Sequence, residues 1–492
     1  MSKLCAQAQI KVAVLRRARL LPIAWAVLLT GCSTLAPEYS RTELPLANDW
    51  STESSAQDTR QLKAQGLSSE LAMQLPWQHF IKDQRLTELI ELALSNNRSL
   101  RQTLADVEAA RATYRIQRAD LFPHLDVGLS GNRNRLSSGT TETSYTAEAG
   151  LSGYEIDLFG KNRSLSAAQM EAYLATAETA KAAHIALISE IANAWLSLAA
   201  DNSALTLAQE TMANAQKTLD ITNKRLELGV DSRVDVASAE TVYHSARSDI
   251  ALYTTQVAQD SNALRLLVGE PFDQRLLPDA LPNSATLVTD VPAGLSSAVL
   301  LQRPDVLAAE HSLKSAHANI GVARAAYFPS LSLTTSGGVA SSVFADIFSG
   351  GASTIWAIAP SITLPIFDGG ANDANLAYSK AQQRKALAAY EYAIQSAFAE
   401  VADALARRAT IQEQLDAEQA LVAAATRSYD LSLARYQNGV DSFQTALEAQ
   451  RTMYSAQQSL ILTRQADLDN RITLYRVLGG GLAESNIEQA EG

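Results

Sequence analysis

Residues 161–228 read KNRSLSAAQMEAYLATAETAKAAHIALISEIANAWLSLAADNSALTLAQETMANAQKTLDITNKRLEL, a run of 68 residues that contains neither glycine nor proline. Glycine and proline are the residues that most readily end a helix, and the run is rich in strong helix formers such as Ala, Leu, Gln and Glu. It therefore predicts one unbroken helix, about 100 Å long at 1.5 Å per residue. No ordinary compact globular core needs a helix of this length.

The part of the chain after about residue 75 contains the same pattern twice, offset by roughly 206 to 210 residues. Residues 371–438 form a second run of 68 residues without glycine or proline. The tetrapeptide Gly-Val-Asp-Ser at 229–232 recurs letter for letter at 439–442. Runs of 39 residues follow the two long runs, at 230–268 and 440–478. We infer that two copies of one unit were fused, each with a long and a shorter helix.

The shorter helices would cover only about 58 Å of the roughly 100 Å spanned by the long ones. Residues 100–122 and 305–328 each end in Phe-Pro, and each would supply about 35 Å more as a helix. Stacked on the shorter helices, these segments would form a second column of nearly the same height as the first.

Between the helices, apolar residues alternate with small or polar ones at 125–130 and 145–152, and again at 331–334 and 356–364. This pattern predicts two β-hairpins, with polar loops around 133–143 and 341–353. Alternation of this kind is typical of a membrane barrel and also of a soluble sandwich. The length of the helices and the lipoprotein-like signal described below favour the barrel.

Four strands cannot close around a lumen, and an open strand edge is not tolerated in lipid. Two chains would give a barrel filled by its own side chains, whereas three chains of four strands would give a 12-stranded barrel. A homotrimer is therefore the smallest assembly that would enclose a passage.

The first 31 residues predict a signal peptide, because basic residues precede a short apolar run at 20–29. The run is too short to span a bilayer as a mature helix. Leu29-Thr30-Gly31-Cys32 resembles a bacterial lipoprotein signal, in which the cysteine is lipidated and becomes the first mature residue. Ser33 follows in place of Asp, and this resemblance then implies the outer membrane. An ordinary secretory signal with a coincidental cysteine is the alternative.

Composition excludes several classes of protein. The formal net charge of -11 argues against a nucleic-acid binder. Cys5 and Cys32 are the only cysteines, so neither a disulfide framework nor a cysteine-rich metal site is available in the body of the chain. The sequence shows no phosphate-binding glycine loop and no His-Glu metal motif at helical spacing. We therefore predict no enzyme, no metal and no cofactor other than a covalent lipid on Cys32.

The repeat, the helix lengths and the hairpins resemble the TolC-like outer-membrane channels, and several motifs resemble the OprM-type lipoprotein branch. The motifs are YRIQRADLFP at 114–123, VPAGL at 291–295, QRPD at 302–305, RY at 435–436 before GVD at 439–441, AQR at 449–451 and LGGG at 478–481. The resemblance covers nearly all of the mature chain. It implies a mainly α protein with a membrane β-barrel, a trimer with 12 strands in the bacterial outer membrane and 12 helical columns forming a periplasmic barrel.

The resemblance also implies a function, the passive exit duct of a tripartite multidrug-type efflux pump. Its partners would be a periplasmic adapter protein and an inner-membrane RND-type pump, and docking would occur at the helical tip. By resemblance the tip comprises Gly229, Val230, Asp231, Ser232, Gly439, Val440, Asp441 and Ser442.

A closed gate is implied at the same tip. The residues that match family gate positions are Tyr436, Glu448, Arg451 and Asp235. Glu448 stands where the branch more often has Asp, which puts the geometry of a gate link in question. Alternatively, Glu448 and Arg451 form an ordinary i,i+3 pair on a helix surface, contributing about 0.2–0.5 kcal/mol. The acidic tip favours cations, or is simply a solvated surface.

These predictions divide the chain into ten segments. They are the signal peptide (1–31), a lipidated extended segment (32–76), the repeat 1 helices (77–123), hairpin (124–159) and long helical hairpin (160–270), a linker (271–304), the repeat 2 helix (305–329), hairpin (330–367) and long helical hairpin (368–479), and a C-terminal tail (480–492).

Other functions fit parts of the pattern. An exit duct for protein secretion or for metal-ion export would share the architecture, and a structural coiled-coil fibre would explain the long helices but not the paired alternating segments. The sequence does not name the cargo, the adapter or the pump.

Overall fold

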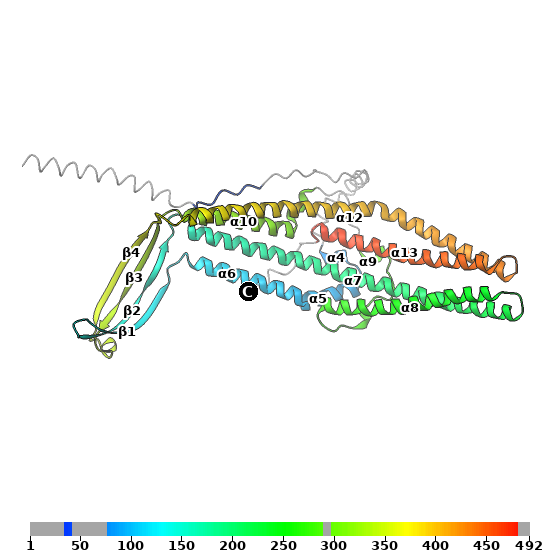
Figure 1. Cartoon of the computed structure of the whole chain (residues 1–492), viewed down its shortest axis with the longest axis horizontal. Helices are drawn as coiled ribbons and strands as arrows, with labels where there is room; N and C mark the ends of the chain where they lie inside the picture. Colours follow the sequence, from blue (N-terminus) through cyan, green and yellow to red (C-terminus); the bar gives the residue numbers. More distant parts are fainter. Residues whose placement is uncertain (1–33, 42–75, 289–296, 481–492) are drawn as a thin grey trace, which may run out of the picture. The chain divides into compact units, whose positions relative to one another are not determined.

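The computed structural model describes residues 34–41, 76–288 and 297–480 (Figure 1). The predicted signal peptide, Cys32 and most of the C-terminal tail lie outside these residues. The described chain divides into two compact units. The first contains residues 34–41, 106–177 and 308–391, and the second contains 76–105, 178–288, 297–307 and 392–480.

The two long glycine- and proline-free runs are helices, as the sequence predicts. They form α7 (Lys161–Glu227) and α12 (Ala371–Gln437), each of 67 residues. Each is followed by a shorter antiparallel helix, α8 (Arg233–Val268) or α13 (Phe443–Val477) (Figure 1). The helices that precede Phe-Pro are α6 (Arg98–Ala119) and α10 (Pro304–Ala325). Short helices complete the set: α4 (Trp77–Phe80), α5 (Gln84–Asn96), α9 (Ser284–Leu287), α11 (Asp346–Ser349), η1 (Gln274–Leu276) and η2 (Ser297–Gln302).

The first unit contains a four-stranded antiparallel sheet in the order β1-β2-β3-β4 (Figure 1). Its strands are β1 (Leu125–Arg135), β2 (Thr141–Ile156), β3 (Ser330–Ser341) and β4 (Ser353–Thr363). The pairing of β2 with β3 joins the hairpins of the two repeats into one sheet. The strands extend further into the loops than the sequence predicts. The residues there are polar on both faces, so the sequence has no alternation of apolar and polar residues that would indicate a strand.

Strand register gives the sheet one apolar and one polar face. Leu129 pairs with Ala147, which pairs with Val339, so these residues share a face. The same face carries Leu125, Val127, Leu151, Ile156, Leu331, Leu333, Trp356, Ile358 and Ile362. The opposite face carries Asp126, Ser130, Asn132, Asn134, Glu142, Ser144, Thr146, Glu148, Glu155, Ser332, Ser336 and Ser361.

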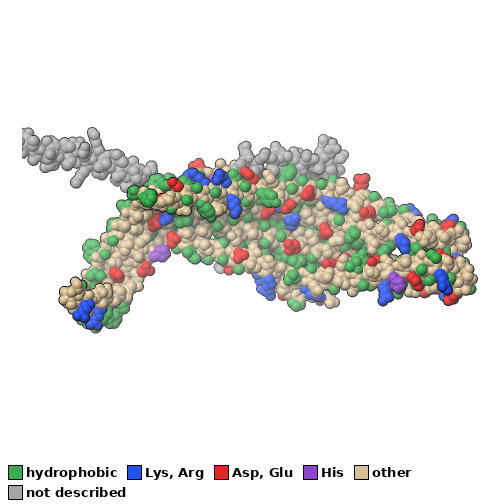
Figure 2. All heavy atoms as spheres, in the orientation of Figure 1, with side chains coloured by type: hydrophobic (Ala, Val, Ile, Leu, Met, Phe, Trp, Pro, Cys, Tyr) green, Lys and Arg blue, Asp and Glu red, His purple; other side chains and the backbone are tan. Residues whose placement is uncertain are grey.

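The apolar face is exposed in the single chain. Val127 is 83% exposed and Trp356 is 76% exposed, and basic side chains gather at the loop end of the sheet in the view of Figure 2. An exposed apolar face opposite a polar one is the pattern of a transmembrane barrel, with lipid outside and water inside. Strands β1 and β4 each pair on one side within the described chain. Their free edges need strands from other copies before the sheet can sit in lipid.

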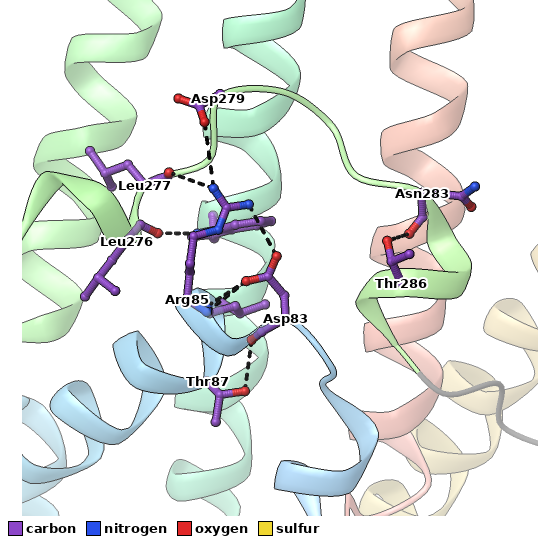
Figure 3. A network of polar contacts seen from close by, with 10 residues as sticks. Asp83, Arg85, Thr87, Leu276, Leu277, Asp279, Asn283 and Thr286 are labelled. Carbon is purple, nitrogen blue, oxygen red and sulfur yellow. Dashed lines mark hydrogen bonds and ion pairs between the residues drawn. The ribbon is translucent and has the colours of Figure 1, made fainter.

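The second unit packs the connection between the repeats against its helices. Trp195 of α7 is fully buried, and its Nε1 donates a hydrogen bond to the carbonyl oxygen of Leu276 at 2.9 Å. The guanidinium of Arg85 lies 5.5 Å from the Trp195 ring and forms ion pairs with Asp83 and Asp279 (Figure 3). Asp83 also caps α5 by accepting from the backbone N–H groups of Arg85 and Leu86. The connection is thereby fixed to α5 and α7.

Two glycines on the polar face of the sheet give a matched test of the pairing between the repeats. A Cβ on Gly150 would lie 2.2 Å from the carbonyl oxygen of Thr335, whereas a Cβ on Gly128 would meet nothing within 4 Å. We expect Gly150→Ala to cost about 1–3 kcal/mol through forced backbone shifts and to reduce the amount of heat-resistant oligomer in outer-membrane fractions. Gly128→Ala should accumulate like the parent protein. Equal accumulation of both variants on unheated gels would show that the β2–β3 approach is not as close as described.

Candidate functional site

Both helical hairpins turn in the same way. Gly229 follows α7 with φ 74° and Gly439 follows α12 with φ 73°, in the left-handed region that glycine adopts without strain. In the first copy the N–H of Val230 donates to the carbonyl oxygen of Arg225 at 2.8 Å. In the second copy Val440 donates to Arg435 at 2.9 Å. The repeated Gly-Val-Asp-Ser is therefore the sequence of two equivalent helix-ending turns.

Each turn carries the same ion pair in a different environment. Arg225 Nε lies 3.0 Å from Asp231 Oδ2, and Arg435 Nη2 lies 2.8 Å from Asp441 Oδ1. The side chains of Arg225 and Asp231 are 21% and 6% exposed, whereas those of Arg435 and Asp441 are 57% and 25% exposed. The Arg435 guanidinium lowers the pKa of the Asp441 carboxyl. The Arg225–Asp231 pair is therefore largely buried, and the Arg435–Asp441 pair is at the surface.

Tyr436 connects the two turns. Its hydroxyl donates a hydrogen bond to Asp231, the Arg225 guanidinium lies 4.7 Å from its ring centroid, and the ring of Phe443 lies 5.2 Å away. Tyr436 is buried in an apolar cluster with Ala239, Ala446 and Leu447. It therefore holds the tip of the second repeat against the tip of the first.

The link made by Tyr436 persists at neutral pH. Burial, and next the hydrogen bond to Asp231, raise the pKa of Tyr436 from 10.0 to about 12. A raised tyrosine pKa favours the protonated, hydrogen-bonded form, so this contribution to stability is complete below pH 10 and is lost as the pH rises through 12.

Further side-chain hydrogen bonds join α13 to α8. Arg451 Nη2 donates to Thr241 Oγ1 at 2.9 Å, and the Tyr454 hydroxyl donates to Asp249 Oδ2 at 2.9 Å. Gln458 Nε2 donates to the Tyr253 hydroxyl at 3.3 Å. The sequence reasoning overlooked all of these residues except Arg451. Their spacing is the available signal, because positions 451, 454 and 458 share one face of a helix.

Two of the four predicted gate residues have local partners. Glu448 accepts a hydrogen bond from Gln444 Nε2 at 2.9 Å, and within the described chain it forms no hydrogen bond or ion pair with Arg451. Asp235 forms a capping box with Ser232 at the start of α8, its Oδ2 accepting from the Ser232 backbone N–H at 2.8 Å. Tyr436 and Arg451 thus form hydrogen bonds with residues of the first repeat, whereas the hydrogen bonds of Glu448 and Asp235 stay within their own repeat.

A groove of about 460 Å³ lies between the first turns of α8 and α13. Its lining includes Thr241 and Arg451, the partners in one of the hydrogen bonds between these helices, together with Arg233, Val234, Ala237, Ser238, Gln444 and Leu447. Among the residues that the structure describes, no three His, Cys, Asp or Glu side chains are grouped so as to hold a metal ion. The groove lies beside a hydrogen bond that joins the two repeats.

Residues 89–270 and 295–480 match the family described as outer membrane efflux protein. The chain belongs to this family. It is 42% identical over 468 residues to the probable efflux pump outer membrane protein TtgC of Pseudomonas putida, a match that covers 93% of this chain and 94% of the relative.

Solved structures of the family have the same fold. A crystal structure of a membrane protein from Pseudomonas aeruginosa superimposes with a TM-score of 0.84 at 38% identity, covering 92% of this chain and 99% of that one. The open state of the Neisseria gonorrhoeae MtrE outer membrane channel superimposes with a TM-score of 0.81 at 37% identity, covering 92% and 100%. The predicted channel fold, the outer-membrane location and the role in efflux are thereby confirmed. The role of the family is transport.

The two ion pairs at the tip give a matched prediction. Asp231→Asn removes the charge that Arg225 and Tyr436 both contact, and hydrogen bonds to a buried charge contribute about 1.5–3 kcal/mol. We expect amide hydrogen exchange at residues 225–235 to accelerate about tenfold or more. Asp441→Asn alters the exposed pair and should accelerate exchange at residues 435–445 much less. Equal acceleration at the two turns would contradict the distinction between them.

Proposed function

We propose that this chain is one subunit of a trimeric exit duct in a tripartite multidrug-type efflux pump. The duct is a passive conduit and catalyses no reaction. Its partners are a periplasmic adapter protein and an inner-membrane RND-type pump. The observation that carries the proposal is the two-faced sheet, whose edge strands β1 and β4 each have one side without a partner strand in the described chain.

Threefold assembly follows from that sheet. If β1 of each copy pairs with β4 of the next, three copies close a ring of 12 strands, and every backbone group at the edges finds a partner. The polar face, with Asp126, Glu142 and Glu148, would then line a water-filled interior. The apolar face would contact lipid.

The tips of the hairpins are the proposed docking surface for the adapter. They comprise Gly229, Val230, Asp231, Ser232, Gly439, Val440, Asp441 and Ser442. Val230 and Val440 are both 61% exposed, and Leu228 beside them is 78% exposed. Apolar side chains held at exposed turns support contact with another protein.

The gate is proposed at the same end of the helices, formed by Tyr436, Glu448, Arg451 and Asp235. Glu448 and Arg451 lie on the exposed part of α13 and would reach the neighbouring subunit, where their role is to link adjacent hairpins. Exposed ion pairs contribute about 0–1 kcal/mol each, so three symmetric copies sum to a few kcal/mol. Docking of the adapter supplies enough free energy to open such a gate, with the α12–α13 hairpins splaying around Gly439.

Conductance of the reconstituted trimer tests both the duct and the gate. The parent channel should show low conductance, and the double variant Glu448→Gln, Arg451→Ala should show a severalfold rise because the links between subunits are removed. A double variant at the exposed surface of α7 and α8, Lys217→Gln with Arg247→Gln, is the control for loss of charge. Absence of conductance in every variant would refute the channel, whereas equal conductance in all of them would refute only the gate.

The lipid on Cys32 is part of the proposal. Residues 34–41 lie along α10, where Arg324 Nη1 donates to the carbonyl oxygen of Leu35 at 3.0 Å and Arg41 forms an ion pair with Glu310. Thr34 packs against Gly160, four residues after the end of β2. Two residues of chain span at most about 7 Å, so a lipid on Cys32 fits a membrane leaflet at the helix-connected end of the sheet.

Metabolic labelling with a radioactive or clickable palmitate tests the lipid. The parent protein should incorporate the label after signal cleavage, and Cys32→Ser should incorporate none because the thiol is the acceptor. Cys5→Ser, whose cysteine lies within the predicted signal peptide, should label like the parent. Label in the Cys32→Ser protein would contradict the assignment.

A further inference from the structure

The lipid-facing row of β1 ends in two arginines. Residues 125, 127, 129, 131, 133 and 135 lie on one face of the strand, and the first three are exposed apolar residues, Leu125, Val127 and Leu129. The row continues through Gly131 to Arg133 and Arg135, at the loop end where basic side chains gather in Figure 2. We propose that Arg133 and Arg135 bind the phosphate groups of the glycolipid in the outer leaflet of the outer membrane. The inference rests on the proposed barrel.

Aromatic residues mark the depth of this site in the membrane. Tyr145 pairs with Gly131 on the apolar face, and the Phe344 ring lies 5.3 Å from the Tyr145 ring in an edge-to-face contact. The ring centroid of Phe348 lies 5.5 Å from that of Phe344, and Phe348 is 72% exposed. Clustered aromatic side chains at the end of barrel strands are typical of the membrane–water interface.

The two guanidinium groups lie beyond these aromatic residues. Arg133 pairs with Thr143 and Arg135 pairs with Thr141, two and four positions past Gly131. At about 3.4 Å per residue their Cα atoms are about 7 and 14 Å further along the strand, or about 5 and 10 Å further from the lipid core when the strand tilts by about 40°. That is the level of polar headgroups, and the side chains still point away from the lumen.

Both guanidiniums are available for a ligand. Arg133 and Arg135 are exposed, and within the described residues neither guanidinium takes part in an ion pair or hydrogen bond. The nearby acidic residue on β2, Glu142, pairs with Asn134 and therefore lies on the opposite face of the sheet. The spacing of two residues places the Cα atoms of the arginines about 7 Å apart on one face, so both guanidiniums can reach the same phosphorylated headgroup.

The charge of the protein as a whole supports a specific role for this pair. The chain has a formal net charge of -11, so a positive surface at this end is not a general property of the sequence. Charged side chains on an edge strand also discourage aggregation, and that role would require no ligand. Arginine in particular forms paired hydrogen bonds with phosphate oxygens, which Lys does not.

Binding of bisphosphorylated hexa-acyl lipid A to purified trimers, counted by native mass spectrometry, tests the proposal. Each basic residue near an anionic lipid surface contributes enough to change affinity about fivefold, so Arg133→Gln with Arg135→Gln should weaken binding about 30-fold. Arg133→Lys with Arg135→Lys should retain part of the affinity. Lys217→Gln with Arg247→Gln, which removes two charges from the helices, should bind like the parent.

The probe is varied to identify the recognised group. Dephosphorylated lipid A should bind the parent as weakly as bisphosphorylated lipid A binds the glutamine variant. Equal binding of bisphosphorylated lipid A by the parent and the glutamine variant would overturn the proposal, and so would equal binding of phosphatidylglycerol and lipid A by the parent. Conductance of the same preparations is recorded in parallel. A glutamine variant that binds lipid A weakly but keeps the conductance of the parent supports the site, whereas absence of conductance even in Glu448→Gln, Arg451→Ala counts against the channel and not against the site.

Discussion

A strand edge with free N–H and C=O groups cannot remain in hydrocarbon, and the rest of this protein depends on that constraint. The chain contributes a sheet with one apolar face, one polar face and an edge strand on each side. The four strands cannot satisfy their own edges around a lumen. Assembly is therefore a condition of membrane insertion and does not merely follow it. The large exposed apolar residues of β1 and β4 are accounted for by lipid and by neighbouring copies.

Duplication explains both the symmetry of the helices and the differences between their tips. The two turns share the same glycine, the same backbone hydrogen bonds and the same Arg–Asp pair. They differ where the second copy has Tyr436 and the first has Leu226. The tyrosine reaches Asp231 and buries it, so that one ion pair becomes internal while its counterpart stays in water. A single difference between the copies thus places two equivalent ion pairs in different environments.

The sequence predicts the helices well because glycine and proline stop them. α7 ends one residue before the predicted limit at Leu228, and the left-handed glycines that follow are visible in the sequence. The number of strands is also predictable, but their ends are not. β1 continues through polar residues such as Asn132 and Asn134, where no alternating apolar residues mark it as a strand.

The tip is harder to predict, since its contacts join residues far apart in the chain. Tyr436 and Asp231 are 205 positions apart, and no local pattern indicates that they meet. Glu448 illustrates the opposite case. Its charge and position suggest a distant partner, yet an ordinary i,i+4 neighbour, Gln444, reaches it within the same helix.

The irregular step in β2 between Leu151 and Tyr154 has a consequence for the interior of the assembly. Glu148 and Glu155 are seven residues apart, and strict alternation would put them on opposite sides of the strand. The extra residue reverses the parity, so that Glu148 opposite Gly338 and Glu155 opposite Ser332 share one side. In a threefold ring each carboxylate recurs three times. Glu155 is paired with Lys161 at 3.1 Å, so the bore would carry one ring of Glu148 carboxylates and one ring of Glu155–Lys161 ion pairs, and a permeating ion would meet them one after the other.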